Sequence, residues 1–282
     1  MCKMVGDYKQ LIFKQFVVNS SVVCLSRTDS KLPVSLLYIV KQTKYIDINN
    51  FVWYNKHAVY RFTKEPKINE EYSDLARIND LVDDPMDLFK SWHEESRKYL
   101  QNMLDIFCLA TSSIDNKIAA RNVVLREFDN EGFVLVTDQR SRKASELDSV
   151  PRAAACFVWC YIDDKGQNIA RQVRAEGAVE KLEPIEFKHL YDREPLFCKI
   201  RSHLCHQDRE IDWDDLKCRH DELLKEYQSG KNTLSMPEHF IGYKLIPTMV
   251  EFYYAKDNLI GDRVQYNKNT SIDRWQQRRL AA

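Results

Sequence analysis

Two stretches of alternating apolar and polar residues lie near the centre of the chain and predict a β-hairpin. They run from Asn122 to Phe128 and from Phe133 to Thr137, and residues 129–132 between them read Asp-Asn-Glu-Gly. Alternation with a period of two is typical of a half-buried strand, and Asp, Asn and Gly favour turns. Ser141 then precedes residues 142–147 in the pattern of a capped helix start. We expect strand, turn, strand and helix in this order.

Apolar residues at helical spacing predict a longer amphipathic helix from Pro85 to Leu104, with Asp84 as its N-cap. Further helices are predicted at residues 184–191, 197–204 and 213–227. The remaining strands are predicted at residues 106–111, 117–128, 153–162, 172–182, 240–245, 249–255 and 264–266. Ala153–Ile162 is almost entirely apolar, so we expect it to be buried on both faces. Short strands with hairpin turns and a few helices predict a small antiparallel barrel with helices packed outside.

The first fifth of the chain is harder to interpret. Residues 1–55 contain short β-like apolar runs at 11–25 and 33–40, and they could form an added strand pair, a poorly ordered extension or a segment absent from the mature protein. The sequence leaves these alternatives open. Residues 64–83 are charged and poor in bulky apolar side chains, which predicts a linker.

Composition and charge narrow the classes of partner. The 282 residues include 42 basic and 42 acidic ones, so no net charge attracts nucleic acid or an anionic membrane. No apolar run reaches the roughly 20 residues that span a bilayer, and residues 19–21 interrupt the short hydrophobic N-terminal stretch. A cytoplasmic protein without a membrane partner is the expectation.

The eight cysteines form no C-x-x-C pair. Three of them, Cys108, Cys156 and Cys160, lie in apolar strand-like runs. Buried free thiols in a reducing compartment are therefore expected, and no metal site is predicted.

Basic residues bracket the central hairpin and suggest a local anion site. They are Arg121, Arg126, Arg140, Arg142 and Lys143. The helix start after Ser141 would leave backbone N–H groups free beside two of these cations, which suits a phosphate. The alternative is a solvated basic surface.

The hairpin and helix start resemble the FMN-binding core of the pyridoxamine 5'-phosphate oxidase family. Other stretches resemble this family in the same order along the chain. They are Arg171–Gly177, Ser202–Gln207, Val250–Phe252, Asp262–Arg263 and Trp275–Ala281. Several separated motifs in one order are more specific than any one of them.

The resemblance implies a mainly β fold, a six-stranded antiparallel split barrel with flanking α-helices, which binds FMN at the interface of a homodimer. It divides the chain into an N-terminal extension at 1–55, an arm and linker at 56–84, and an FMN-binding oxidase domain with the C-terminal dimerisation region at 85–282. Tyr60 and Arg61 match an arm that can fold over the substrate.

The resemblance also implies which residues bind the cofactor. Arg121, Arg142 and Lys143 would surround the FMN phosphate, where arginine contacts can be bidentate and charge-assisted. The full cofactor-binding set is Arg121, Asn122, Val123, Val124, Val136, Thr137, Arg142, Lys143, Gln172, Gln207, Asp208, Tyr253 and Arg263. Two of these depart from the family, because Asp208 replaces a Ser and Tyr253 replaces a Trp beside the flavin. Asp208 would weaken FMN binding if it pointed inward.

The substrate side departs further. Arg126, Tyr191, Arg193 and Cys198 match or lie near the family's phosphate-binding Lys, Tyr, Arg and Ser. Leu259 and Gly261 stand where the family has the Arg and His that cover the substrate ring, so no catalytic residue is certain.

Two functions remain. One is FMN-dependent oxidation of pyridoxamine 5'-phosphate and pyridoxine 5'-phosphate, both phosphorylated B6 vitamers, to pyridoxal 5'-phosphate with O2 as acceptor. The other is a catalytically impaired paralogue that binds FMN or pyridoxal phosphate without efficient turnover.

Overall fold

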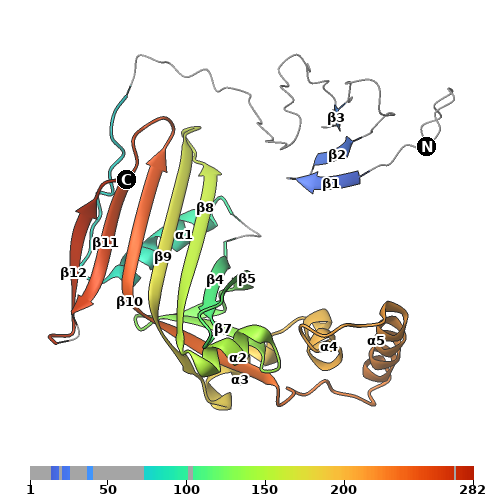
Figure 1. Cartoon of the computed structure of the whole chain (residues 1–282). Coiled ribbons are helices and arrows are strands. Elements are labelled where there is room, and N and C mark those ends of the chain that lie inside the picture. Colours follow the sequence, from blue (N-terminus) through green and yellow to red (C-terminus); the bar gives the residue numbers. More distant parts are fainter. Residues whose placement is uncertain (1–13, 19–20, 26–36, 41–72, 101–103, 270) are drawn as a thin grey trace, which may run out of the picture. The chain divides into compact units, whose positions relative to one another are not determined.

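The computed structural model describes residues 14–18, 21–25, 37–40, 73–100, 104–269 and 271–282, and the chain divides into two compact units at residues 1–68 and 69–282 (Figure 1). In the first unit, β1 (Lys14–Val18), β2 (Ser21–Leu25) and β3 (Leu37–Val40) form a three-stranded antiparallel sheet. Strands therefore form within both predicted β-like runs. Tyr60 and Arg61 lie outside the described residues.

The second unit holds five helices and nine strands among its described residues. The helices are α1 (Pro85–Arg97), α2 (Arg142–Ser149), α3 (Pro184–Asp192), α4 (Leu196–Leu204) and α5 (Trp213–Gln228). The strands are β4 (Ile106–Ser112), β5 (Ile118–Val124), β6 (Glu127–Phe128), β7 (Phe133–Asp138), β8 (Arg152–Ile162), β9 (Asn168–Lys181), β10 (Phe240–Lys256), β11 (Asp262–Asn269) and β12 (Arg274–Leu280).

Six of these strands follow one another around a barrel if β5 and β6 are taken as one interrupted strand. The antiparallel pairs run from β4 to β8, β9, β10, β7 and β6, and β5 pairs with β4. The interruption at Leu125 and Arg126 is bridged because their N–H groups donate to Asp105 O (2.7 Å) and Val134 O (2.9 Å) on either side. The predicted six-stranded antiparallel split barrel with flanking helices is confirmed.

A bulge in β10 makes this arrangement possible. Gly177 pairs with Pro247 and Glu176 with Met249, so Thr248 is an extra residue and the register shifts by one. One edge of β10 pairs with β7 at Phe240–Leu245 and then with β11 at Met249–Tyr254, while the other edge pairs with β9 from Tyr243 to Lys256. Figure 1 shows β10 bending as it passes from one neighbour to the next.

The barrel core is aromatic, and α1 packs against it. Asp84 caps this helix by accepting a hydrogen bond from Met86 N, as predicted, and Pro85 occupies its first turn. Phe89 is fully buried and makes edge-to-face contacts with Phe128, Phe133 and Phe157, at ring centroid distances of 4.8–5.0 Å. The helix ends at Arg97, seven residues before the predicted end.

Residues of the predicted linker take part in this core. Ala76 and Ile78 are buried, Ala76 N donates to Ile260 O (2.8 Å), and Ile78 N donates to Asp262 Oδ2 (2.8 Å). The segment before α1 therefore packs beside the start of β11.

Two predictions about burial are wrong. Strand β8 is not buried on both faces, because alternate side chains point outward and Val158 and Ile162 are 56% and 63% exposed. No other described element of the second unit covers these side chains. Cys160 is exposed on the same face, while Cys108 and Cys156 are half-buried, and all six described cysteines carry free thiols.

Strand β12 was not predicted. Among the described residues, no helix is long and apolar enough to cross a membrane.

Candidate functional site

The N-terminus of α2 gathers most of the predicted phosphate-binding residues. Ser141 is buried and its hydroxyl accepts from Ala144 N (3.4 Å), so the side chain caps the helix as predicted. Arg142 and Lys143 form the first turn. The preceding strand, β7, places Thr137 next to them, since Lys143 Nζ donates to Thr137 Oγ1 (3.1 Å).

A buried carboxylate holds two of the arginines together. Glu146 accepts from Arg121 (3.1 Å) on β5, from Arg142 Nε (2.7 Å) and from the Thr111 hydroxyl on β4. Burial raises the pKa of Glu146, but these three hydrogen bonds outweigh it and hold the pKa below its ordinary value. Glu146 therefore stays ionised and fixes both guanidinium groups. Glu146 and Thr111 were not predicted as site residues. Glu146 stands four residues after Arg142, which is the spacing of a helical ion pair.

The loop after α4 closes over the other side of this cluster. Gln207 Oε1 accepts from Lys143 Nζ (2.7 Å), and Asp208 Oδ2 accepts from the backbone N–H of Arg142 (2.8 Å). Asp208 thus points inward and occupies one of the N–H groups that an anion would use. Burial lowers the pKa of Lys143, and the charge of Asp208 partly offsets this. With Arg121, Arg142 and Lys143 against Glu146 and Asp208, the cluster retains one formal positive charge.

The other cofactor candidates form a second group on the outer face of the sheet. Gln172 on β9, Tyr253 on β10 and Arg263 on β11 are direct cross-strand partners, so their side chains lie in one row. The guanidinium carbon of Arg263 lies 5.5 Å from the centroid of the Tyr253 ring. Arg263 Nε is buried and has no hydrogen-bond partner among the described residues. An orphaned buried donor marks a place where a ligand acceptor would be favourable.

Glu251 lies in the next row of side chains on this face and contacts several of them. It belongs to one of the motifs of the sequence, but no role was predicted for it. Its buried carboxylate accepts from Arg174 (3.4 Å) and Gln265 (3.1 Å) and lies 3.8 Å from Arg263 Nη1. Glu251 therefore orients Arg263 beside Tyr253.

The two groups lie on different parts of the barrel. Ile241 pairs with Thr137 of the first group, whereas Tyr253 of the second group stands twelve residues further along β10. Along a strand this is up to about 40 Å. Among the described residues, no hydrogen bond or ion pair joins one group to the other. Asn122 and Val124 are exposed on β5, and Val123 and Val136 are half-buried.

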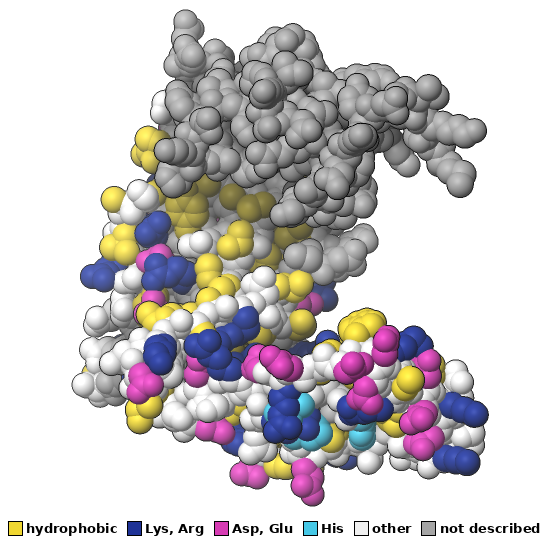
Figure 2. All heavy atoms as spheres, turned by 45° about the vertical axis from the view of Figure 1, so that its right-hand side comes forward, with side chains coloured by type: hydrophobic (Ala, Val, Ile, Leu, Met, Phe, Trp, Pro, Cys, Tyr) yellow, Lys and Arg dark blue, Asp and Glu magenta, His cyan; other side chains and the backbone are white. Residues whose placement is uncertain are grey.

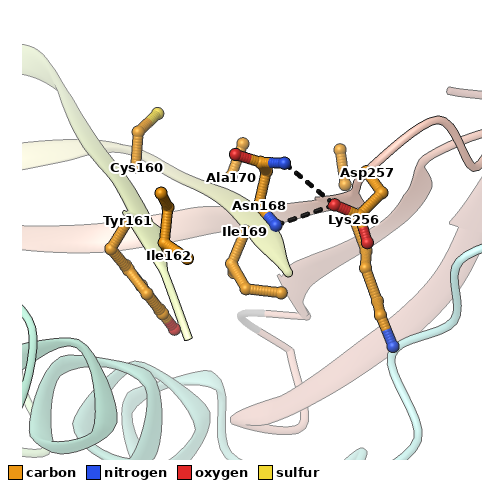
Figure 3. Close-up of a pocket in the computed structure, with 9 residues that line it drawn as sticks. Cys160, Tyr161, Ile162, Asn168, Ile169, Ala170, Lys256 and Asp257 are labelled. Atoms are coloured by element: carbon orange, nitrogen blue, oxygen red, sulfur yellow. Dashed lines mark hydrogen bonds between the residues drawn. The ribbon is translucent and has the colours of Figure 1, made fainter. Parts of the chain in front are cut away.

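A surface depression of about 350 Å³ borders the second group. Figure 3 shows the residues that line it. Ala170 and Ala255 line it and stand two residues from Gln172 and Tyr253 on the same strands. Asn168 closes its end by donating from N and Nδ2 to Asp257 Oδ1 (2.8 and 3.0 Å). The depression extends the outer face beyond the Gln172 row.

Two family models and several known proteins match this chain. The family model described as pyridoxamine 5'-phosphate oxidase matches residues 93–199, and the model described as the pyridoxine 5'-phosphate oxidase C-terminal dimerisation region matches residues 240–282. A pyridoxine/pyridoxamine 5'-phosphate oxidase of Pelagibacter ubique is 34% identical over 187 residues, 66% of this chain and 86% of that protein. The Salinibacter ruber oxidase is 31% identical over 78% of this chain and 99% of its own length.

The chain belongs to the pyridoxamine 5'-phosphate oxidase family.

Two solved structures support the same fold. PhzG from Burkholderia lata, solved with tetrahydrophenazine-1-carboxylic acid, is 25% identical with a TM-score of 0.62 and covers 72% of this chain and 95% of its own. A pyridoxamine 5'-phosphate oxidase-related, FMN-binding protein from Nostoc punctiforme is 14% identical with a TM-score of 0.53, over 69% of this chain and 97% of its own. The second likeness concerns the fold alone.

The four substrate-binding candidates of this oxidase-family chain do not converge on an open phosphate site. Arg126 forms an ion pair with the buried carboxylate of Glu194. Arg193 is 74% exposed and lies 3.6 Å from Glu127 Oε1. The Cys198 thiol is 3.6 Å from a guanidinium nitrogen of Arg201.

Tyr191 is buried, and its hydroxyl lies within hydrogen-bond distance of α4 and of the segment after α5. It donates to Leu234 O (2.8 Å) and lies 3.2 Å from His203 Nε2. Burial raises the pKa of Tyr191, which keeps it a donor.

Arg126 also lines a polar cleft of about 510 Å³ with Arg97 and Asp105. On the face drawn in Figure 2, basic and acidic side chains are interspersed.

Gly261 lies against the ring of Tyr253. A Cβ at this residue would lie 2.7 Å from Cε2 and the hydroxyl oxygen of Tyr253. The Tyr253 ring therefore fills the space that a larger residue at 261 would need. Leu259 is half-buried, and its N–H donates to Lys256 O (3.0 Å).

Proposed function

We propose that this protein is an FMN-dependent oxidase that converts pyridoxamine 5'-phosphate and pyridoxine 5'-phosphate to pyridoxal 5'-phosphate, with O2 as electron acceptor, as a step of vitamin B6 salvage. The observation that carries the proposal is the convergence of Arg121, Arg142 and Lys143 at the α2 N-terminus, in a chain whose relatives bear this activity in their names.

The first group fits the phosphate of FMN. Arg121 and Arg142 are held in place by Glu146, so they would bind a phosphate without first being ordered. Lys143 is half-buried, and burial lowers its pKa because the ammonium group has lost part of its hydration. A dianion beside it would stabilise the ammonium charge in place of that water. Asp208 is the one group that competes, and its carboxylate would have to leave Arg142 N for a phosphate oxygen to bind there.

The second group fits the ring end of FMN. Gln172 and Arg263 supply donors, Arg263 with an unused Nε, and Tyr253 supplies an aromatic face. When bound, FMN would accept a hydride from the substrate carbon and pass the electrons to O2, which gives hydrogen peroxide. The side chains of this chain would bind the two ends of the cofactor, orient its ring and provide positive charge near it.

We further propose that the site is completed in a homodimer. The two groups lie up to about 40 Å apart along β10, and a mononucleotide would meet both more readily if the second copy supplied one of them. The match of residues 240–282 to a dimerisation region supports this assembly. The exposed apolar side chains of β8 would then be covered by the partner.

We expect the purified protein to be yellow, and its flavin absorbance to bleach when pyridoxamine 5'-phosphate is added without O2. Chemical reduction by dithionite gives the fully bleached reference, and admission of O2 should restore the band with formation of hydrogen peroxide. A yellow protein that dithionite bleaches but the vitamer does not would support the binding role without efficient turnover. A colourless protein that takes up no added FMN would contradict the cofactor assignment itself.

A further inference from the structure

The ion pair between Arg126 and Glu194 joins the interruption between β5 and β6 to the segment that follows α3. The Glu194 carboxylate is 3% exposed and the Arg126 guanidinium 27% exposed. Oε1 of Glu194 accepts the hydrogen bond from Arg126, whereas Oε2 is buried and accepts none from the described residues. A carboxylate withdrawn from water in this way depends on its partner for charge compensation.

Neighbouring polar groups give little further compensation. Arg193, next in sequence to Glu194, is directed to Glu127 and is mostly in solvent. Burial and the negative charge of Glu194 raise the pKa of the Cys198 thiol, so at neutral pH this side chain is an uncharged donor. Lys199 donates to the backbone oxygen of Asp192 (3.0 Å). The guanidinium of Arg126 is therefore the principal positive charge facing Glu194.

A phosphate ester carries a charge of about −1.5 to −2 at neutral pH. If such a group approached Arg126, it would meet a cation whose charge is already matched by a buried anion. The phosphate would have to displace Glu194, which would then be buried without a counterion, or accept the repulsion between two anions. Either course costs affinity. An uncharged group neither displaces Glu194 nor is repelled by it. A hydroxyl could donate a hydrogen bond to the unused Glu194 Oε2.

We propose that Glu194 is a specificity-determining residue that reduces the advantage of phosphorylated over unphosphorylated substrates at this site, because an uncharged tail that donates a hydrogen bond, such as a free hydroxymethyl group, avoids the repulsion. The inference rests on the proposed oxidation of B6 vitamers and concerns which form of the vitamer is used. Glu194 affects substrate preference in two ways. It neutralises the charge of Arg126, and its unpartnered oxygen can accept a hydrogen bond from the substrate.

The test compares phosphorylated and free vitamers in Glu194→Gln, which keeps the shape and the acceptor for Arg126 but removes the charge. We expect the ratio of kcat/KM for pyridoxine 5'-phosphate over pyridoxine to rise about tenfold or more, which corresponds to about 1.4 kcal/mol. Most of the change should lie in KM for the phosphate ester. Asp192→Asn is the matched control, because Asp192 is two residues away and its carboxylate is 56% exposed and paired with Lys188. This control should change the ratio less than twofold.

A second readout does not require turnover. The dissociation constants of pyridoxal 5'-phosphate and pyridoxal, measured from their absorbance changes on binding, should show the same shift in Glu194→Gln, and Arg126→Gln should shift the ratio the opposite way. If no variant turns over but the binding ratio moves, the proposed oxidation fails and the role of Glu194 stands. If folded Glu194→Gln turns over or binds both vitamers with an unchanged ratio, the inference is overturned.

Discussion

Replacement of Lys143 by Met should weaken FMN binding by about 2 kcal/mol, roughly 30-fold in Kd. Lys143 is half-buried and already bonded to Thr137 and Gln207, so its ammonium group is fixed at the α2 N-terminus before any anion arrives. Met keeps the length and the apolar stem but removes the charge. Titration of the apoprotein with FMN, followed by quenching of flavin fluorescence, measures the change.

Arg140→Met is the matched control for this experiment. Arg140 stands three residues away and is paired with Asp138 at 2.7 Å, and its guanidinium also donates to Cys205 O (3.0 Å). Asp138 holds the charge of Arg140 outside the group formed by Arg121, Arg142 and Lys143. We expect less than a threefold change in Kd. Equal losses in the two variants would mean that general surface charge, and not the fixed ammonium of Lys143, attracts the cofactor.

The same lysine gives FMN binding a defined pH dependence. Burial lowers the pKa of Lys143, so its ammonium begins to lose its proton at a lower pH than that of an exposed lysine. The phosphate is anionic throughout this range. FMN affinity of the native protein should therefore fall as the pH rises through the lowered pKa. The Lys143→Met protein should lack this decrease, and a parallel decrease in both proteins would assign it to another group.

The local elements could be predicted because their signals lie within a few residues of one another. The turn at residues 129–132 forms as expected, with Asp129 Oδ1 accepting from the N–H groups of Glu131 and Gly132 (2.9 and 3.0 Å). Ser141 caps α2 for the same reason. The helix start and the turn are decided by side chains that bond to their own neighbouring backbone.

The contacts that determine the charge of the site could not be predicted in this way. Glu194 meets Arg126 across 68 residues, and Asp208 meets Arg142 across 66. The local sequence around Glu194 resembles an ordinary charged helix end, and only the fold buries its carboxylate. The four substrate-binding positions were chosen by resemblance, and the structure gives three of them partners that their own segments do not suggest.

The misjudged face of β8 has a related cause. A continuous apolar run predicts burial on two faces, but it does not say whether the covering surface belongs to the same chain. Val158 and Ile162 are exposed because no described element within residues 69–282 packs on them. The same apolar pattern fits a strand that is covered by a second subunit.

Replacement of Gly177 by Ala should destabilise the barrel by about 3 kcal/mol. A Cβ at this residue would lie 2.7 Å from the carbonyl carbon of Ile246 and from Cα of Pro247, and closer still to the Ile246 carbonyl oxygen. These are backbone atoms at the bulge, where β10 changes register against β9. They cannot move aside as a flexible side chain could. For a domain of this size the melting temperature should fall by about 6–12 °C in a thermal unfolding scan.

Gly166→Ala separates this close approach from the general cost of losing a glycine. Gly166 has φ +74° but no heavy atom within 4 Å of an added Cβ, so Ala there should cost only about 1 kcal/mol. Equal losses of stability in the two variants would show that the bulge does not require a glycine. A much larger loss for Gly177→Ala would locate the constraint at the point where β10 passes from the Thr137 end of the barrel to the Tyr253 end. Because that bend sets the separation of the two cofactor groups, the surviving folded Gly177→Ala protein should also bind FMN more weakly than Gly166→Ala.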